Sequence, residues 1–176
     1  YHNVFVKLQD VVSQATGKTW DDYFSTRLKN KIGMSGSWIL ADNNVVYWST
    51  TRSMARFGLL ALNNGNWDGA TIINPTFFQE ATNSSQTINN SYGYLWWLNG
   101  KTSYHLPQSQ FEFPGSIIPS APKDMYCALG KNDQKIYVVP SKKLVVIRMG
   151  NAADNANAAL SDFDDVLWQK INAVIN

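Results

Sequence analysis

The sequence predicts an α+β fold in which helices come first, an antiparallel set of strands follows, and one helix closes the chain. Two observations predict this order. Up to about residue 81, apolar side chains recur at helical spacing between residues that cap or end helices. From residue 124 onward, three short segments rich in Val, Ile and Tyr are separated by turn residues, and the chain then ends on an amphipathic stretch.

The first two helices are predicted from an apolar stripe and a cap. The stripe has members at helical spacing, and these are Phe5, Leu8, Val12 and Ala15. Gly17 ends this helix, because glycine readily adopts the left-handed conformation of a helix terminus. The second helix starts after Thr19, whose side chain can cap it, and Asp22 stands at the third position of a capping box.

Two more helices are predicted before residue 82. Ser49 or Thr50 caps the first of them, which ends at Asn63-Asn64-Gly65. The second is short and opens at Asn74-Pro75, since the missing N–H of proline costs nothing at the first helical position. Its buried face is expected to consist of Phe77, Phe78 and Ala81.

The second half is predicted to contain strands and a final helix. An aromatic strand is expected over Tyr92–Leu98, followed by a proline-bearing loop. Three strands are then expected at Asp124–Leu129, Gln134–Val139 and Leu144–Met149, joined by short turns as an antiparallel meander. The closing helix should pack on one face of these strands through an apolar stripe made of Leu160, Phe163, Leu167, Ile171 and Val174.

Composition excludes several classes of function. The 15 basic and 13 acidic side chains are scattered, and no basic run exceeds Lys142-Lys143, so nucleic-acid binding is not expected. The single cysteine, Cys127, cannot form an internal disulfide, and with only two histidines we expect neither a metal site nor another cofactor. No apolar run approaches the roughly 20 residues of a membrane span, so no membrane span is expected either.

Four sequence stretches, taken in their order along the chain, match the motifs of a known family. They are Tyr1-His2-Asn3 before a helix, Gly17–Trp20 through Ile32–Met34, Ser53–Gly58 through Trp67–Gly69, and Tyr92–Trp97 with Pro122 through Pro140. Together they resemble the serine β-lactamase-related hydrolases, the group of class C β-lactamases, penicillin-binding proteins and D,D-peptidases. Each motif alone is weak, whereas four in the same order form a specific signal.

The resemblance implies that residues 1–176 are the C-terminal part of one β-lactamase/transpeptidase-like domain. In this family a serine in Ser-x-x-Lys attacks an amide or ester carbonyl to give an acyl-enzyme. That motif precedes Tyr-x-Asn in the family, so the nucleophile is expected outside this chain, in a missing N-terminal part that would be its partner. The chain alone is expected to be inactive. Export to the periplasm or out of the cell is implied by the family only.

The resemblance also assigns roles to individual residues. Tyr1 would shuttle the proton, and Asn3 would hydrogen-bond the motif lysine and the substrate amide. Ala128 and Gly130 would line the substrate, since Ala128-Leu129-Gly130 stands where the family often has Lys-Thr-Gly. Backbone near Gly130 can still donate an N–H to an oxyanion, while the missing lysine removes a clamp for a substrate carboxylate. One indole of Trp96 and Trp97 would face substrate, and we assign Trp97 to that role.

One Ser-x-x-Lys does occur in the chain, at Ser120-Ala121-Pro122-Lys123. A catalytic pair of this spacing needs a helical turn so that serine and lysine share a face. Pro122 disfavours helix at the residue before it, so Ser120 is not expected to be catalytic.

Two alternatives to an enzyme remain open at this stage. A catalytically silent, penicillin-binding-like module used for binding is favoured mildly by Ala128 in place of the motif lysine. A plain α+β interaction domain with accidental motif matches is the other. The sequence upstream of Tyr1 separates all three, because an intact Ser-x-x-Lys there supports the enzyme.

Overall fold

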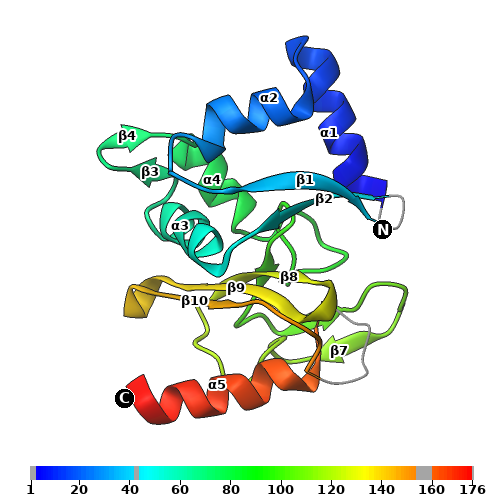
Figure 1. Cartoon of the computed structure of the whole chain (residues 1–176). Helices are drawn as coiled ribbons and strands as arrows, with labels where there is room; N and C mark the ends of the chain where they lie inside the picture. The colour runs from blue at the N-terminus through cyan, green and yellow to red at the C-terminus, as the bar shows by residue number, and fades with distance from the viewer. Residues whose placement is uncertain (1–2, 42–43, 154–159, 176) are drawn as a thin grey trace.

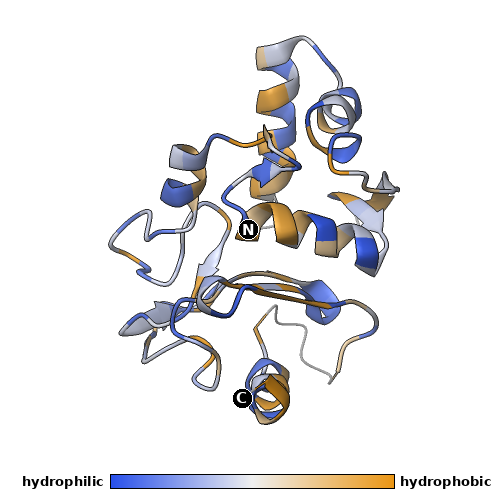
Figure 2. Ribbon diagram, turned by 90° about the vertical axis from the view of Figure 1, so that its left-hand side faces the viewer, coloured by the Kyte–Doolittle hydropathy of each residue, from blue (hydrophilic) through white to orange (hydrophobic). Residues whose placement is uncertain are grey.

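A four-stranded antiparallel sheet in the order β10-β9-β8-β5 forms the centre of the molecule. The computed structural model describes residues 3–41, 44–153 and 160–175. Helix α5 covers one face of the sheet and the remaining helices lie on the other side, as the two views show (Figures 1 and 2). The sheet strands are β5 (Trp97–Leu98), β8 (Tyr126–Gly130), β9 (Gln134–Val139) and β10 (Leu144–Arg148).

The predicted meander is confirmed. β8 pairs antiparallel with β9 through a register that includes Ala128 opposite Ile136, and β9 pairs with β10 through Tyr137 opposite Val146. Two short 3-10 turns join them, η2 (Lys131–Asp133) and η3 (Pro140–Lys142). The first strand starts two residues later than predicted, because the backbone there forms a turn that is closed by a bond from the Met125 N–H to the Pro122 carbonyl. The Asp124 carboxylate accepts bonds from the backbone N–H and the hydroxyl of Ser141.

The first two predicted helices are confirmed, with one change. Helix α1 spans Asn3–Thr16 and α2 spans Trp20–Phe24. The Thr19 side chain accepts a bond from the Asp22 backbone N–H at 3.2 Å, which is the expected cap. Helix α2 does not stop at Phe24 but continues as a π-helical turn, η1 (Ser25–Lys29).

The next two helices are also confirmed. Thr50, rather than Ser49, caps α3 (Thr51–Leu62), and Asn74 caps α4 (Pro75–Ala81) with Pro75 at the first turn. Helix α3 packs on β9 and β10. The approach is so close that a Cβ on Gly58 would lie 2.5 Å from a Val145 methyl group.

The prediction for the buried face of α4 is wrong at one position. Phe78 and Ala81 are buried, but Phe77 is 53% exposed. Its ring lies 5.9 Å from that of Tyr94, which is also exposed. Phe77 lies at the margin of the buried arc, because it is about 100° from Phe78 around the helix and about 40° beyond Ala81.

The predicted strand over Tyr92–Leu98 is largely wrong, since only its last two residues belong to β5. The backbone instead forms a tight turn that is closed by a bridge between Tyr92 and Trp97, and Leu95 has a φ of 64°. The Tyr94 N–H donates to the Ala81 carbonyl at the end of α4. This bond to the helix end competes with a strand ladder and fixes the turn.

Three hairpins were not predicted from the sequence. They pair β1 (Gly36–Ala41) with β2 (Asn44–Ser49), β3 (Asn66–Trp67) with β4 (Ala70–Thr71), and β6 (Ser103–His105) with β7 (Glu112–Pro114). The first lies against α2, where the rings of Trp38 and Tyr47 both pack edge-on to Phe24 at 5.1 and 4.8 Å. The alternation of Val46 and Trp48 with Val45 and Tyr47 was the available signal.

The closing helix α5 (Asp162–Ile175) packs on the sheet as predicted, through part of the predicted stripe and through Trp168, which the prediction did not include. Trp168 is fully buried, with Leu167 and Ile171 beside it in the core between α5 and the sheet. Val174 is 82% exposed, so its inclusion in the buried stripe is wrong. Phe163 lies under the Arg148 guanidinium, 5.3 Å from ring centre to cation, rather than in that core. A buried carboxylate on this helix sets its rotation, as described below.

Candidate active site

The strand β8 presents two of the predicted substrate-binding residues on the same face of the sheet. Ala128 and Gly130 are two residues apart, so both point away from α5, and Ala128 borders the cluster that faces α3 and α4. On the opposite face, Cys127 packs in the core under α5, and Leu129 between the two residues borders the same core. Gly130 has an ordinary extended backbone (φ −117°), and a Cβ there would meet only the Gln134 side chain and carbonyl at 3.4 Å. Neither conformation nor packing therefore requires glycine at this position.

The turn after Gly130 is held from below by a buried side chain. Asn132 and Asp133 both have left-handed backbones, with φ of 58° and 56°. The Asp133 carboxylate accepts bonds from the Ala153 N–H at 2.9 Å and the Ser161 hydroxyl at 3.0 Å. These bonds connect the turn between β8 and β9 to the segment after β10, which contains Ala153, and to Ser161 just before α5.

A buried ion cluster, defined as Lys135, Asp133, Asp164 and Tyr137, completes this support. The Lys135 ammonium lies 3.1 Å from the Asp133 carboxylate and 2.9 Å from that of Asp164, and the three side chains are at most 1% exposed. The Tyr137 hydroxyl donates to the other oxygen of Asp164. Because Asp164 belongs to α5, this cluster sets the rotation of the helix and joins it to the strand beside the candidate site.

The cluster predicts a loss of stability in acid. Burial alone would raise the pKa of Asp133, but bonds from Ala153, Lys135 and Ser161 hold it below its ordinary value of 3.8. A carboxyl group with a lowered folded pKa stabilises the fold above the unfolded pKa and loses that contribution as pH falls through the folded value. Urea unfolding between pH 6 and pH 2.5 should therefore show a steeper loss for the wild type than for Asp133→Asn.

The matched control for this prediction is Asp10→Asn, which changes an exposed carboxylate on α1. Asparagine tolerates the left-handed backbone at position 133, so the substitution tests charge rather than conformation. Parallel pH profiles for wild type and Asp133→Asn would contradict the prediction.

Cys127 is a buried thiol in β8. Burial, and then the nearby Asp164 charge, raise its pKa well above the ordinary value of 9.0. Since the thiolate is the reactive form, this cysteine is not a nucleophile.

Ser120 is held by hydrogen bonds to residues of α5. Its backbone N–H donates to Asp165 at 2.7 Å and its hydroxyl donates to the same carboxylate at 3.0 Å. Its carbonyl accepts a bond from the Asn172 amide at 2.6 Å. Ser120 thus anchors α5 to the loop before β8, which agrees with the expectation that it is not catalytic.

The two residues assigned to catalysis are not tested by the structure. Tyr1 lies outside the described residues, and α1 begins at Asn3, whose side chain is also outside them. In Figure 1 the start of α1 and the turn between β8 and β9 lie toward the same right-hand side of the molecule. The convergence of Tyr1 with Gly130 stays a prediction.

Both tryptophans of the predicted aromatic strand are core residues. Trp97 is 4% exposed and packs edge-on against Tyr92 at 4.9 Å in the core under α5. Trp96 is buried on the other side of the sheet, stacked on Phe57 at 6.1 Å. The predicted alternation of the two rings is confirmed, whereas the contact of Trp97 with substrate stays a prediction that its burial disfavours.

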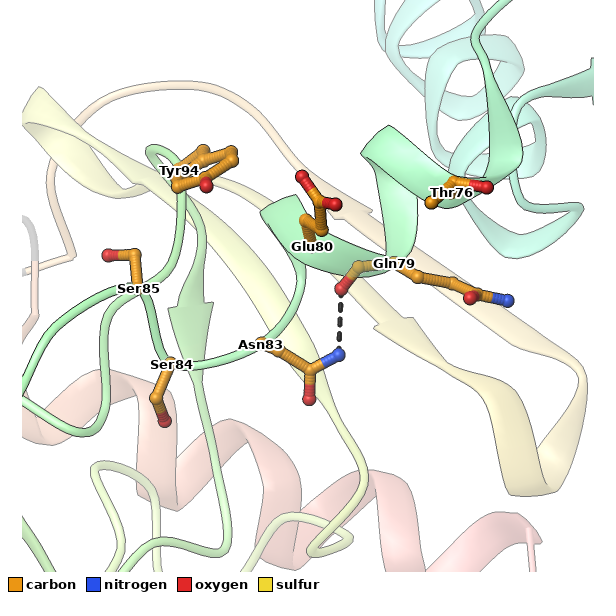
Figure 3. A pocket seen from close by; sticks show the side chains of 7 residues that line it. All are labelled: Thr76, Gln79, Glu80, Asn83, Ser84, Ser85 and Tyr94. Carbon is orange, nitrogen blue, oxygen red and sulfur yellow. Dashed lines mark hydrogen bonds between the residues drawn. The ribbon is translucent and has the colours of Figure 1, made fainter.

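Two surface pockets occur away from these residues. One, of about 340 Å³, lies between α4 and the following loop, and its lining side chains are drawn in Figure 3. There the Asn83 amide donates to the Gln79 carbonyl, and Glu80 and Tyr94 stand on opposite sides. The other, of about 420 Å³, is lined by Thr102, Ser103, Glu112 and Pro114. Neither includes Ala128, Gly130 or Trp97.

Within residues 3–41, 44–153 and 160–175, no three His, Cys, Asp or Glu side chains gather so that they could hold a metal ion. Among the helices formed by those residues, none combines the length and apolarity needed to cross a bilayer.

Sequence reasoning missed the ion cluster. Its signal was Lys135 in the otherwise apolar segment QKIYVV, at the same alternate positions as Tyr137 and Val139. A lysine on the buried face of a strand needs a carboxylate partner, and Asp133 and the acidic first turn of α5 supply it.

Comparison with solved structures shows that the chain has a β-lactamase-like fold. It superposes on a protein from Bacillus anthracis assigned as a 6-aminohexanoate-dimer hydrolase with a TM-score of 0.66 and 21% identity, covering 94% of this chain and 42% of that one. A protein from Bacteroides dorei assigned as a β-lactamase gives 0.65 and 12%, covering 96% and 55%. A β-lactamase from Mycobacterium bovis gives 0.65 and 15%, covering 96% and 61%.

The chain thus spans only about half the length of these structural neighbours. No curated protein matches its sequence. The mixed helices and antiparallel sheet are a part of the β-lactamase/transpeptidase-like fold that those neighbours share. The β-lactamase family model matches residues 1–167, which is nearly the whole sequence, and the chain therefore belongs to the β-lactamase family.

Proposed function

We propose that the chain is part of a serine hydrolase, related to the class C β-lactamases, that cleaves an amide or ester through an acyl-enzyme. The nucleophile is supplied by sequence outside this chain, in a Ser-x-x-Lys motif of the same protein. The single observation that carries the proposal is the extent of the family match. It runs from residue 1 to residue 167 and so includes both Tyr1-His2-Asn3 and the β8 strand.

In this proposal Tyr1 moves the proton between the nucleophile and the leaving group. A free phenol titrates near ~10, so Tyr1 can accept a proton at neutral pH only beside a cation such as the motif lysine. Asn3 hydrogen-bonds that lysine and the substrate amide. A backbone N–H near Gly130 donates to the developing oxyanion. Because glycine has no Cβ, a substrate can approach the backbone closely at this position.

In this proposal the site does not require a carboxylate on the substrate. Ala128 carries no charge, and its methyl group borders an apolar cluster rather than a cation. Esters or uncharged amides fit this strand better than β-lactams, whose carboxylate would have no partner on β8. The names of the structural neighbours are consistent with hydrolysis of amide bonds, although likeness at 12–21% identity carries the fold alone. Periplasmic or extracellular location is proposed on the family alone.

A second candidate function is a catalytically silent binding module. The specific observation in its favour is Ala128 in place of the motif lysine. In that case the protein to which this chain belongs would bind acyl donors without being acylated by them.

The first test uses the isolated 176-residue chain with a fluorescent penicillin and with p-nitrophenyl acetate. Because Ser120 is bonded to Asp165, we expect no hydrolysis above background and no acyl mass increment that maps to Ser120. The variant Ser120→Ala is the control, since any adduct that persists in it is surface acylation. A stable adduct on Ser120 that is lost in Ser120→Ala would show that the chain is a complete enzyme and would refute the proposal.

A further inference from the structure

Helix α1 exposes an apolar stripe, defined here as Val4, Leu8, Val11 and Ala15. Val4, Leu8 and Val11 are 48%, 46% and 59% exposed, and Ala15 is exposed as well. Their spacing of four, three and four residues places them on one side of the helix. On one flank of the stripe the neighbours are polar and include the ion pair of Lys7 with Asp10 at 3.5 Å.

The residues on the other flank of the stripe pack on the rest of the chain. Phe5 and Val12 are partly buried, and the Gln9 amide donates to the Val45 carbonyl of β2 at 3.3 Å. The stripe therefore cannot turn inward without exposing these residues. The apolar surface of α1 is thus wider than the part that this chain covers, as is typical of helices that are buried between other elements.

The sheet has an unfinished edge as well. Within the described residues β10 pairs with β9 alone, and none of its backbone groups bonds outside that ladder. Its sequence, LVVIR, has no proline, and its one charge, Arg148, stands at the end of the strand over the Phe163 ring. Two incomplete features in one chain indicate that something else covers this fold.

We propose that the stripe of α1 is the docking surface for the remaining part of the same β-lactamase-family domain, through a helix packed along it. This inference rests on the proposed function, in which the nucleophile comes from that part. The solved neighbours supply the argument for the occupant, because 94–96% of this chain covers only 42–61% of theirs. The spacing of the stripe suits a helix, which packs on ridges three and four residues apart.

The test compares thermal unfolding of two proteins, the isolated chain and the chain joined to whatever its own gene encodes upstream of residue 1. In each, Leu8→Glu or Val11→Glu is set against Gln14→Glu, which adds the same charge to an exposed polar position of α1. In the isolated chain all three variants should unfold within about 2 °C of the wild type, since substitutions at exposed positions have small effects. In the longer protein the two stripe variants should unfold at least about 5 °C lower and Gln14→Glu should not.

Three results would overturn the proposal. Equal tolerance of all variants in the longer protein would show that nothing covers the stripe, and the absence of a domain-sized segment upstream would remove the occupant. A wild-type isolated chain that is dimeric by light scattering, and monomeric as Leu8→Glu, would assign the stripe to a second copy. The readout is stability and not activity, so the two proposals can fail separately. A longer protein that is destabilised by the stripe variants but forms no acyl-enzyme would refute the proposed function and would still support the docking surface.

Discussion

Replacement of Lys135 by methionine is expected to destabilise the fold by about 3–5 kcal/mol, because it leaves two buried carboxylates without their cation. Lys135 lies 3.1 Å from Asp133 and 2.9 Å from Asp164, and its side chain is fully buried. Methionine is similar in length and fills the space, so the expected loss is electrostatic rather than a cavity effect. Urea unfolding at pH 7 measures it, and thermal unfolding should shift by roughly 10 °C for a domain of this size.

Two further variants identify the cause of that loss. Lys170→Met, at an exposed position of α5, should change the unfolding free energy by no more than about 0.5 kcal/mol. Lys135→Met combined with Asp164→Asn removes one of the stranded charges and should recover part of the stability. A single Lys135→Met variant that unfolds within about 1 kcal/mol of the wild type would show that the pair is balanced by its desolvation cost and would contradict the prediction.

The local structure of the chain was predictable wherever it depends on neighbours in sequence. The caps of α2, α3 and α4 are set by Thr19, Thr50 and Asn74, whose side chains accept bonds from N–H groups two or three residues later. The meander of β8, β9 and β10 follows from three apolar segments separated by turns too short for any crossover. These elements need no knowledge of the rest of the fold.

The missed features depend on residues far apart in the sequence. The turn over residues 92–97 is held by a bond from Tyr94 to Ala81, which no local pattern reveals. The rotation of α5 is set by Asp164 against Lys135, 29 residues away, so a purely apolar stripe missed Asp164 and Trp168, the buried residues of this helix. Such tertiary contacts outweigh the local sequence pattern. In α5, the interaction of Asp164 with Lys135 has a larger effect on the rotation of the helix than the burial of Val174 would have.

The candidate site was predictable only in part for the same reason. Sequence places Ala128 and Gly130 on one face of β8, and the register with β9 confirms their alternation with Cys127. It does not reveal that the turn after Gly130 is anchored by Asp133, or that Trp97 is enclosed by the core. The site strand is thus positioned by a buried ionic cluster beneath it, which joins it to α5.

In the longer protein with an intact Ser-x-x-Lys upstream, Tyr1→Phe is expected to lower turnover by about 10²–10⁴-fold, the usual contribution of a positioned acid–base group. Only the phenolic proton is removed, so thermal unfolding should be unchanged and the loss should fall on kcat for a p-nitrophenyl ester rather than on KM. Tyr94→Phe is the matched control, because it deletes an exposed hydroxyl beside α4, away from β8.

The pattern across the two variants decides the assignment of Tyr1. Ester hydrolysis should exceed β-lactam hydrolysis in the wild type, since Ala128 offers no partner for a carboxylate. A Tyr1→Phe variant that keeps turnover within about threefold of the wild type would remove Tyr1 from the mechanism, because the loss of a general base costs far more than that. Equal losses in Tyr1→Phe and Tyr94→Phe would indicate a general effect on the fold. Acylation that persists in Tyr1→Phe while hydrolysis of the adduct fails would restrict the residue to activation of water, the second half of the reaction.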